Sequence, residues 1–331
     1  MKHLVLCEQG TFLGTTGERL VVHKGEETLA EHPLSRLRTI TIAKPGVSLS
    51  GNALLACAAR GIGVFICGYS DEMAVAVSGA AAHAVAAVRR AQFAFAESDR
   101  ASDLCARILY GKIRNQRAVL CYFGKYAGKD AQTAESLNAA AQGLKQMADA
   151  LAGEVKAAAP DWRNRIMGLE GQAAALYWSA LSQVSLLPSV FPGRTGRGAQ
   201  DPVNAALNYG YAILRSQIWH AILIAGLEPY VGVLHVDRPG KPSLALDLME
   251  EYRPWVVDRT IIKMRSTLQG AKELSPPIRK HIATAVLETF ESRLPYHGKQ
   301  LSLSSILQRQ IYRLSGHFMG KKAYKPLLFK W

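Results

Sequence analysis

Residues 62–97 read IGVFICGYSDEMAVAVSGAAAHAVAAVRRAQFAFAE, and the character of the chain changes within this stretch. Ile62 to Cys67 is a short run of β-branched and aromatic residues, which is typical of a strand. After Gly79 the sequence becomes alanine-rich, with apolar residues at helical spacing. We therefore expect a domain boundary between about residues 69 and 82, where turn-forming residues gather.

The chain before this boundary is predicted to form a small β-rich domain, residues 1–79. Its strand-like runs are brief and are separated by glycines. These runs are His3–Glu8, Glu18–His23, Arg38–Ile42 and Ile62–Cys67. Ser50 can cap one helix over residues 52–60, which Gly61 then ends.

The chain after the boundary, residues 80–331, is predicted to form a larger, all-helical domain, so the fold class is α+β. Several segments show the 3.6-residue apolar period of a helix. They are Ala80–Glu97, Ser102–Phe123, Ala131–Ala158, Ile166–Val184, Pro202–Ala225, Leu244–Lys263, Pro277–Glu291 and Leu303–Gly316. Asp201 and Pro202 form a typical helix start, because the Asp can cap free N–H groups and Pro fits the first helical position.

Composition favours a folded protein with an anionic partner. The chain has 49% hydrophobic and 20% charged residues and a net charge of +14, which favours binding to nucleic acid or a membrane surface. Residues 259–331 hold fourteen Lys and Arg against three Glu, although such a segment can also be a solvated surface. The start has no signal-peptide core and no apolar stretch approaches the roughly 20 residues that span a bilayer. The five cysteines lack metal or redox spacing and are expected to be buried thiols, so we expect a cytoplasmic protein.

Acidic residues on otherwise apolar helices are the first candidates for chemistry. Glu170 has small neighbours in Gly168-Leu169-Glu170-Gly171, which would let a substrate approach its carboxylate. Asp247 and Glu250 are three residues apart, so on a helix their carboxylates project from one face. His235 would reach them from the preceding loop. Each has an ordinary alternative: a Glu that complements a helix dipole, a wet helix face, or a core histidine.

Taken together, these side chains suit a divalent cation. Three carboxylates and one imidazole without a thiolate form a set suited to Mg²⁺ or Mn²⁺ rather than structural zinc. A cation held by carboxylates within a basic surface is the usual arrangement for chemistry on phosphodiesters.

A glycine-rich cationic loop and the helix after it are candidates for DNA binding. The loop carries two arginines that could clamp phosphate, and the helix carries a polar stripe at helical spacing. The predicted DNA-binding residues are Arg194, Arg197, Asn204, Asn208, Tyr211 and Arg215. The alternative is a solvated connector followed by an exposed helix face.

These stretches together resemble the larger of the two universal CRISPR adaptation proteins, the endonuclease-integrase of spacer acquisition. The resemblance rests on residues 168–171, on Asp201-Pro202-Val203-Asn204 with Asn208-Tyr209-Gly210-Tyr211, on Leu234-His235, and on Ser243 to Glu250 with Arg253-Pro254. Weaker similarity occurs at Arg89 with Gln92 and at Lys112 to Gln116.

The resemblance implies a homodimer with an N-terminal β-domain that dimerises, a helical catalytic domain, and a small ferredoxin-like partner protein. It implies that Glu170, His235, Asp247 and Glu250 form a site for Mg²⁺ or Mn²⁺, with Asp247 acting through water or activating a nucleophile. Some members of the family have Asp at the position of Glu250. The implied reaction is attack of a 3′-hydroxyl of a captured double-stranded DNA fragment on a repeat phosphodiester.

Two other functions remain open on the sequence. One is a non-catalytic dimeric scaffold that holds DNA ends, and the other is a structure-selective nuclease that acts outside adaptation. The lysine-rich tail after residue 320 could contact either DNA or the partner protein.

Overall fold

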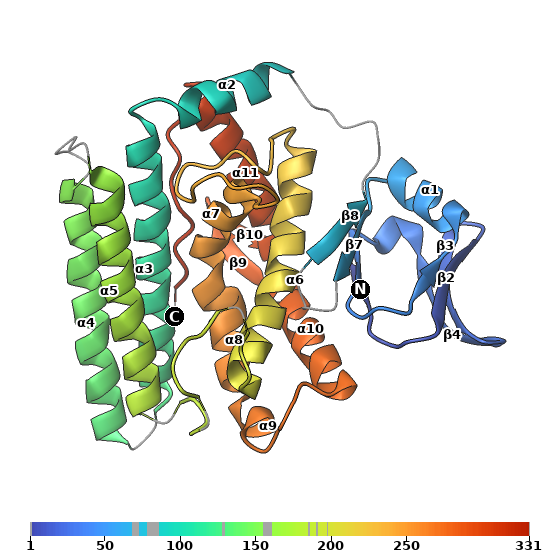
Figure 1. Ribbon diagram of the computed structural model, residues 1–331, viewed down its shortest axis with the longest axis horizontal. Helices are drawn as coiled ribbons and strands as arrows, with labels where there is room; N and C mark the ends of the chain where they lie inside the picture. Colours follow the sequence, from blue (N-terminus) through green and yellow to red (C-terminus); the bar gives the residue numbers. More distant parts are fainter. Residues whose placement is uncertain are drawn as a thin grey trace.

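The computed structural model describes residues 2–67, 73–77, 86–127, 130–154, 161–184, 186–189, 191–196 and 198–330. Two four-stranded sheets form its N-terminal part (Figure 1). One sheet has the order β1-β5-β7-β8, with strands His3–Leu6, Thr39–Ile42, Gly63–Cys67 and Met73–Val77. The other has the order β4-β3-β2-β6, with strands Glu27–Pro33, Arg19–Lys24, Thr11–Thr16 and Ser48–Leu49. The first three strands of the β1 sheet are parallel, and β8 pairs antiparallel with β7.

A small apolar core holds the N-terminal part together. Leu13, Leu20 and Ile40 are fully buried in it. Helix α1, Gly51–Ala59, begins where the sequence predicts, because the Ser50 hydroxyl accepts the N–H of Ala53 at 3.0 Å. A single 3₁₀ turn, η1 (Leu34–Arg36), follows β4. The predicted boundary at residue 79 lies outside the described residues and stays a prediction.

Helices make up most of the rest of the described chain. They are α2 Ala86–Ala96, α3 Ala101–Lys125, α4 Ala131–Glu154, α5 Trp162–Gln183, α6 Pro202–Ile224, α7 Ser243–Tyr252, α8 Arg259–Lys263, α9 Arg265–Gln269, α10 Pro276–Glu291 and α11 Leu303–Phe318. A π-helical segment, η3 (Arg253–Asp258), joins α7 to α8. The predicted helix over residues 244–263 is therefore continuous but widened next to Pro254, which has no N–H to donate to the ladder.

The helices pack around one apolar cluster, with α6 placed beside the N-terminal sheet and α3, α4 and α5 on the far side (Figure 1). Residues 321–330 run extended along α3 and α7. Asn115 on α3 holds this segment by donating to the Leu327 carbonyl and accepting the N–H of Phe329, each at 2.9 Å. Phe329 also stacks on Trp255, with ring centroids 5.3 Å apart. The tail is thus part of the helical core.

The α+β fold class is confirmed, with one correction to the predicted all-helical second domain. β9 (Arg293–Tyr296) and β10 (Lys299–Ser302) form an antiparallel hairpin between α10 and α11. Its two-residue turn is His297-Gly298, and both residues have positive φ, 47° and 76°. Two positive φ values are typical of the tight turn that joins the strands of a hairpin. The hairpin was not predicted because its two strands are short and lack an alternating apolar pattern.

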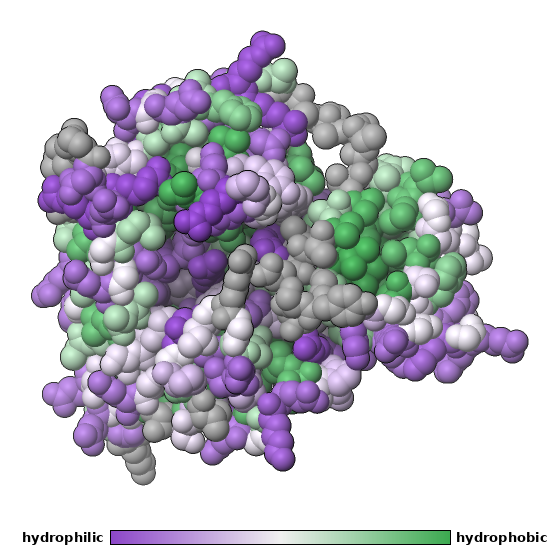
Figure 2. Space-filling view, viewed as in Figure 1, coloured by the Kyte–Doolittle hydropathy of each residue, from purple (hydrophilic) through white to green (hydrophobic). Residues whose placement is uncertain are grey.

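The surface of the N-terminal part carries an exposed apolar patch. Apolar side chains gather on the face of the N-terminal part over α1 (Figure 2), where Leu55 is 70% exposed. None of the described helices is long and apolar enough to cross a membrane. All five cysteines are free thiols and four are buried, as predicted.

Candidate metal centre

Asp247 organises the loop that carries His235. Its carboxylate on α7 is fully buried and accepts the backbone N–H groups of Val233, Leu234 and His235 at 2.6, 2.9 and 2.9 Å. A Cβ on Gly232 would lie 2.6 Å from Asp247 Oδ2, so only glycine allows this close approach. With these acceptor positions in use, the geometry favours a positioning role for Asp247 over direct ligation.

The same carboxylate orients the imidazole. His235 Nδ1 lies 2.7 Å from Asp247 Oδ1. Donation of the Nδ1 proton to this carboxylate leaves the Nε2 lone pair as the free ligand atom, which is the usual arrangement of a metal-binding histidine. The side chain of His235 is 24% exposed, so Nε2 is accessible from solvent. Arg163, at the start of α5, donates to the Leu234 carbonyl and braces the loop from another side.

A second anchor of this loop comes from α2. The buried Gln92 amide donates to the carbonyls of Glu228 and Val231 at 2.8 and 2.7 Å and accepts the N–H of Glu228 at 2.8 Å. Arg89, one turn earlier, donates to the Gly226 carbonyl at 3.2 Å. Backbone groups that no helix or strand satisfies are therefore satisfied by side chains.

Glu170 on α5 and Glu250 on α7 converge on one cationic group. The Lys112 ammonium on α3 contacts Glu170 Oε1 and lies 2.6 Å from Glu250 Oε2. Arg253 places its Nη1 2.6 Å from the other oxygen of Glu250. The Lys112 and Glu250 side chains are only 11% and 4% exposed, so this is a largely desolvated charge cluster.

The cations keep Glu250 ionised. Burial alone would raise the pKa of its carboxyl, but the charges of Arg253 and Lys112 oppose that effect, and the pKa is lowered to about 2. Burial would likewise lower the pKa of Lys112, and Glu250 and Glu170 outweigh it, so the ammonium stays charged. The Glu250 carboxylate is thus deprotonated at neutral pH, the form that binds a metal ion.

These residues fit a hard divalent cation. Glu250 Oε2 is buried and, within the part of the chain that the structure describes, has only the Lys112 ammonium as a partner. Oxygen atoms from Glu170 and Glu250 already share one cationic atom, and the contact of His235 Nδ1 with Asp247 leaves Nε2 as the nitrogen for ligation. Within the described residues, no three His, Cys, Asp or Glu side chains form a closed metal cage. The structure brings together Glu170 with Glu250, and His235 with Asp247, as two pairs.

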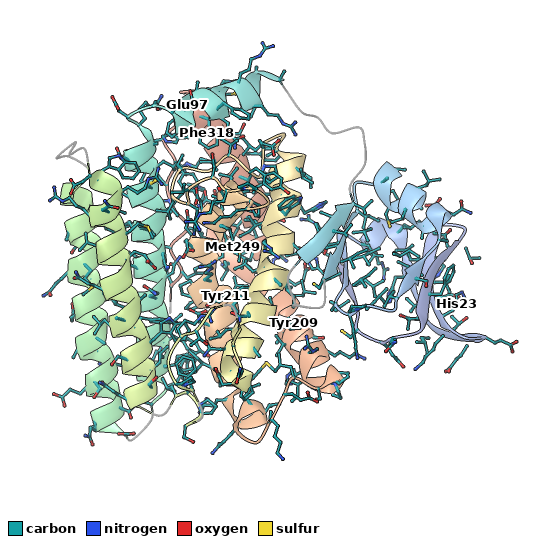
Figure 3. The ribbon with its side chains drawn as sticks, in the orientation of Figure 1. His23, Glu97, Tyr209, Tyr211, Met249 and Phe318 are labelled. Carbon is teal, nitrogen blue, oxygen red and sulfur yellow. The ribbon has the colours of Figure 1, made fainter. Side chains whose placement is uncertain are left out.

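Arg194, one of the arginines predicted to bind DNA, makes contacts within the protein. Arg194 donates to the side-chain oxygens of Asn204 and Asn208 at 2.9 and 2.7 Å and lies over the ring of Tyr211, 5.3 Å from its centroid. Tyr211 lies on α6 (Figure 3), and its hydroxyl donates to the Asp258 carboxylate. Burial raises the pKa of the Asp258 carboxyl to about 6. This network fixes the 191–196 loop against α6 and η3.

The structure places Asn204, predicted to be part of a DNA-binding stripe on α6, inside the protein, and its DNA role stays a prediction. That side chain is fully buried, and its amide donates to Gly193 and Asp201 while its oxygen accepts Arg194 and the Thr195 N–H. Its polar atoms are used by the loop because the helix start and the loop fold onto each other. Asn208, Tyr211 and Arg215 are partly buried, and a DNA role for them stays a prediction. Arg197 lies outside the described residues.

Comparison with known proteins gives the family. The model of the family described as CRISPR associated protein Cas1 matches residues 4–274. The chain belongs to the Cas1 family. A CRISPR-associated endonuclease Cas1 from Francisella tularensis subsp. novicida is 41% identical over 331 residues, covering 100% of both chains. A Cas1 endonuclease from Archaeoglobus fulgidus is 32% identical and covers 99% of each chain.

Solved structures show the same fold at low sequence identity. A casposase bound to integration product has a TM-score of 0.79 at 21% identity, covering 98% of this chain and 93% of the other. The Cas1 protein from Thermotoga maritima has a TM-score of 0.76 at 17% identity, covering 99% and 100%. Both show that this chain shares their overall fold.

Sequence reasoning missed several residues that build the centre. Lys112 and Gln92 lie in stretches where the sequence showed only weak similarity to the family, and no ligand chemistry pointed to either. The sequence signal that could have identified them is a lysine or glutamine on the apolar side of a predicted helix, because such a side chain needs a buried partner. Arg253, one turn after Glu250, was part of the family motif but had no assigned role.

Proposed function

We propose that this Cas1-family protein is a metal-dependent DNA endonuclease and integrase that inserts short DNA fragments into a CRISPR array. The observation that supports it most is the convergence of Glu170 and Glu250 on one cationic position next to an imidazole oriented by Asp247. The relatives named as CRISPR-associated endonucleases, over the full chain length, support the same activity.

Glu170, His235 and Glu250 would hold the divalent cation, Mg²⁺ or Mn²⁺. The cation would supply charge stabilisation for the pentavalent phosphorus and for the leaving oxygen. Asp247 keeps the His235 ring turned and the loop fixed, and Gln92 and Arg163 brace that loop. In the reaction, the fragment's 3′-hydroxyl gives up its proton to solvent as its oxygen bonds to phosphorus, and the repeat's 3′-oxygen leaves with the bonding electrons and takes up a proton from solvent. In hydrolysis, water replaces the fragment's hydroxyl.

We also propose the assembly in which this chemistry takes place. A structure with a TM-score of 0.76 at 22% identity, covering 99% of this chain and 36% of the other, is a Cas6-RT-Cas1–Cas2 complex, which supports a small Cas2-type partner for this chain. The apolar surface over α1 supports homodimerisation through the N-terminal part (Figure 2). The excess of Lys and Arg after residue 259 supports DNA binding without sequence reading.

The test is strand integration of a short duplex into supercoiled, repeat-containing plasmid, with Mn²⁺ or with chelator and with a Cas2-type partner added. Wild type should integrate only with metal, and Glu170→Ala should lose activity by at least about a hundredfold. Glu135→Ala, an exposed acid on α4, is the matched control and should behave as wild type.

Other outcomes would support other functions. DNA binding with no metal-dependent strand transfer or cleavage would support the non-catalytic scaffold. Cleavage of branched substrates without integration would support a nuclease that acts outside adaptation.

A further inference from the structure

Lys112 has a position that the reaction alone does not explain. It lies in the middle of α3, which packs against both α5 and α7. Its ammonium contacts one oxygen of Glu170 and one oxygen of Glu250, and its side chain is 11% exposed. A fully charged lysine buried between two proposed metal ligands is expensive to desolvate unless it balances their charge.

The charge balance of the cluster is complete without another ion. Glu170 and Glu250 carry two negative charges, and Lys112 and Arg253 carry two positive charges. A divalent cation added to these four side chains would give them a net charge of about +2, and the buried Asp247 carboxylate beside His235 would offset only one of those charges, so an excess positive charge would remain at low dielectric. One of the two internal cations therefore has to leave when a metal ion binds.

The geometry identifies which cation leaves. Lys112 contacts both carboxylates, whereas Arg253 contacts only Glu250, on the oxygen that faces away from Lys112. Arg253 is also held against the Tyr211 ring, 5.1 Å from its centroid. Among the described residues, Glu250 Oε2 has no partner besides the Lys112 ammonium 2.6 Å away, so no second donor holds this oxygen once the ammonium moves. The lysine stem has four rotatable bonds, so its ammonium can move while α3 stays in place.

We propose that Lys112 is an exchangeable internal cation: its ammonium occupies the metal position between Glu170 and Glu250, and a divalent ion displaces it onto a phosphate of bound DNA. This inference rests on the proposed function of the site. Its consequence is that DNA and metal bind cooperatively, because a DNA phosphate provides the anion that the displaced ammonium needs. By linkage, each ligand raises the affinity of the other by the same factor.

The experiment measures Mn²⁺ affinity by the electron paramagnetic resonance signal of free Mn²⁺, with and without a short DNA duplex. For wild type, the duplex should tighten Mn²⁺ binding by about tenfold or more. For Lys112→Met, Mn²⁺ should bind about tenfold more tightly than to wild type without DNA, since the competing charge is gone, and the duplex should add little.

A control variant tests whether net charge alone causes the effect. Lys125→Met removes one exposed charge from the same helix, 13 residues further along and about 20 Å away. It should keep the wild-type Mn²⁺ affinity and the wild-type coupling to DNA. Loss of coupling in this variant as well would overturn the inference.

The remaining outcomes separate this inference from the proposed function. Equal Mn²⁺ affinity and equal coupling in wild type and Lys112→Met would contradict the exchange of Lys112, although the proposed metal centre would still agree with the result. No Mn²⁺ binding by wild type at any concentration tested would overturn both.

A measurement on the wild-type protein covers the case in which Lys112→Met does not fold. Labelling with an amine-reactive reagent, followed by peptide mass spectrometry, reports whether the ammonium is held in the ion pair. Adding Mn²⁺ to the DNA-free protein should increase labelling of Lys112 severalfold and leave Lys125 unchanged. Unchanged or reduced labelling of Lys112 would contradict the displacement.

Discussion

Glu250 and Glu251 are neighbours on α7 with opposite electrostatic surroundings. Arg253 and Lys112 overcome the effect of burial and hold the pKa of Glu250 at about 2. Burial raises the pKa of Glu251 to about 8, and its hydrogen bonds from the Tyr324 hydroxyl and the Leu327 N–H only partly offset that effect. One residue therefore faces the cation cluster, and the next faces the C-terminal segment, where it acts as a structural anchor.

At the same scale, Asp247→Asn tests the positioning role of that carboxylate. An amide of the same shape has a single oxygen and cannot accept all of the N–H groups that Asp247 accepts. We expect Mn²⁺ affinity and strand integration to fall by about 10- to 100-fold while the protein stays folded. Asp237→Asn, exposed on the same loop, is the control. Full activity of Asp247→Asn would show that the loop needs no carboxylate anchor.

At the scale of elements, α2 acts on the centre through the 226–231 backbone. Gln92→Leu keeps the side-chain volume but leaves two carbonyls and one N–H of the loop without partners. The unpaired groups should destabilise the protein by about 2 to 4 kcal/mol and weaken Mn²⁺ binding about tenfold. Thermal unfolding and Mn²⁺ titration measure both effects.

Gln132→Leu is the chemically matched control, because its side chain is exposed on α4. It should leave both quantities unchanged. A Gln92→Leu protein with lowered stability and wild-type Mn²⁺ affinity would mean that α2 supports the fold and not the site.

The elements also show what sequence could predict. Long helices with clear caps, such as Pro202–Ile224, follow from a local apolar period and an Asp-Pro start. The edge strand Glu27–Pro33 has an almost wholly exposed pattern and so lacked the alternation that marks a strand. The proposed metal ligands were predicted from residue type and family similarity. Their supports, Lys112 and Gln92, were not, because their roles depend on partners 58 to 139 residues away.

At the scale of the whole molecule, two histidines lie where the N-terminal sheet meets the helices. His3 Nδ1 lies 2.7 Å from Thr39 Oγ1 and its Nε2 lies 3.1 Å from Glu291 on α10. His220 on α6 packs edge-on against Phe65, with ring centroids 6.0 Å apart. Burial lowers the pKa of both from 6.5 to about 4, with Glu291 only partly offsetting it at His3.

Burial of His3 and His220 should make the free energy of unfolding fall at acid pH. The unfolded chain binds protons on these rings below pH 6.5, whereas the folded chain resists until about pH 4. The contribution of the two neutral rings to the free energy of unfolding is therefore complete above pH 6.5. It is lost as pH falls toward 4, by about 3 kcal/mol for each ring at most. Urea unfolding between pH 7 and 4 should give a shallower loss for His220→Phe than for wild type. His281→Phe, exposed on α10, should keep the wild-type slope.

The contacts that build the centre join residues far apart along the chain. Lys112 and Glu170 are 58 positions apart, Gln92 and Glu228 are 136 apart, and Asn115 meets Leu327 across 212 positions. Loop-closure entropy makes such contacts slow to form, so they belong to the late steps of folding. A chain still emerging from the ribosome lacks α7, and with it Glu250, after every helix up to α6 has been synthesised. Under the proposed function, the growing chain would therefore lack a complete set of proposed metal ligands until about three quarters of the molecule has been synthesised.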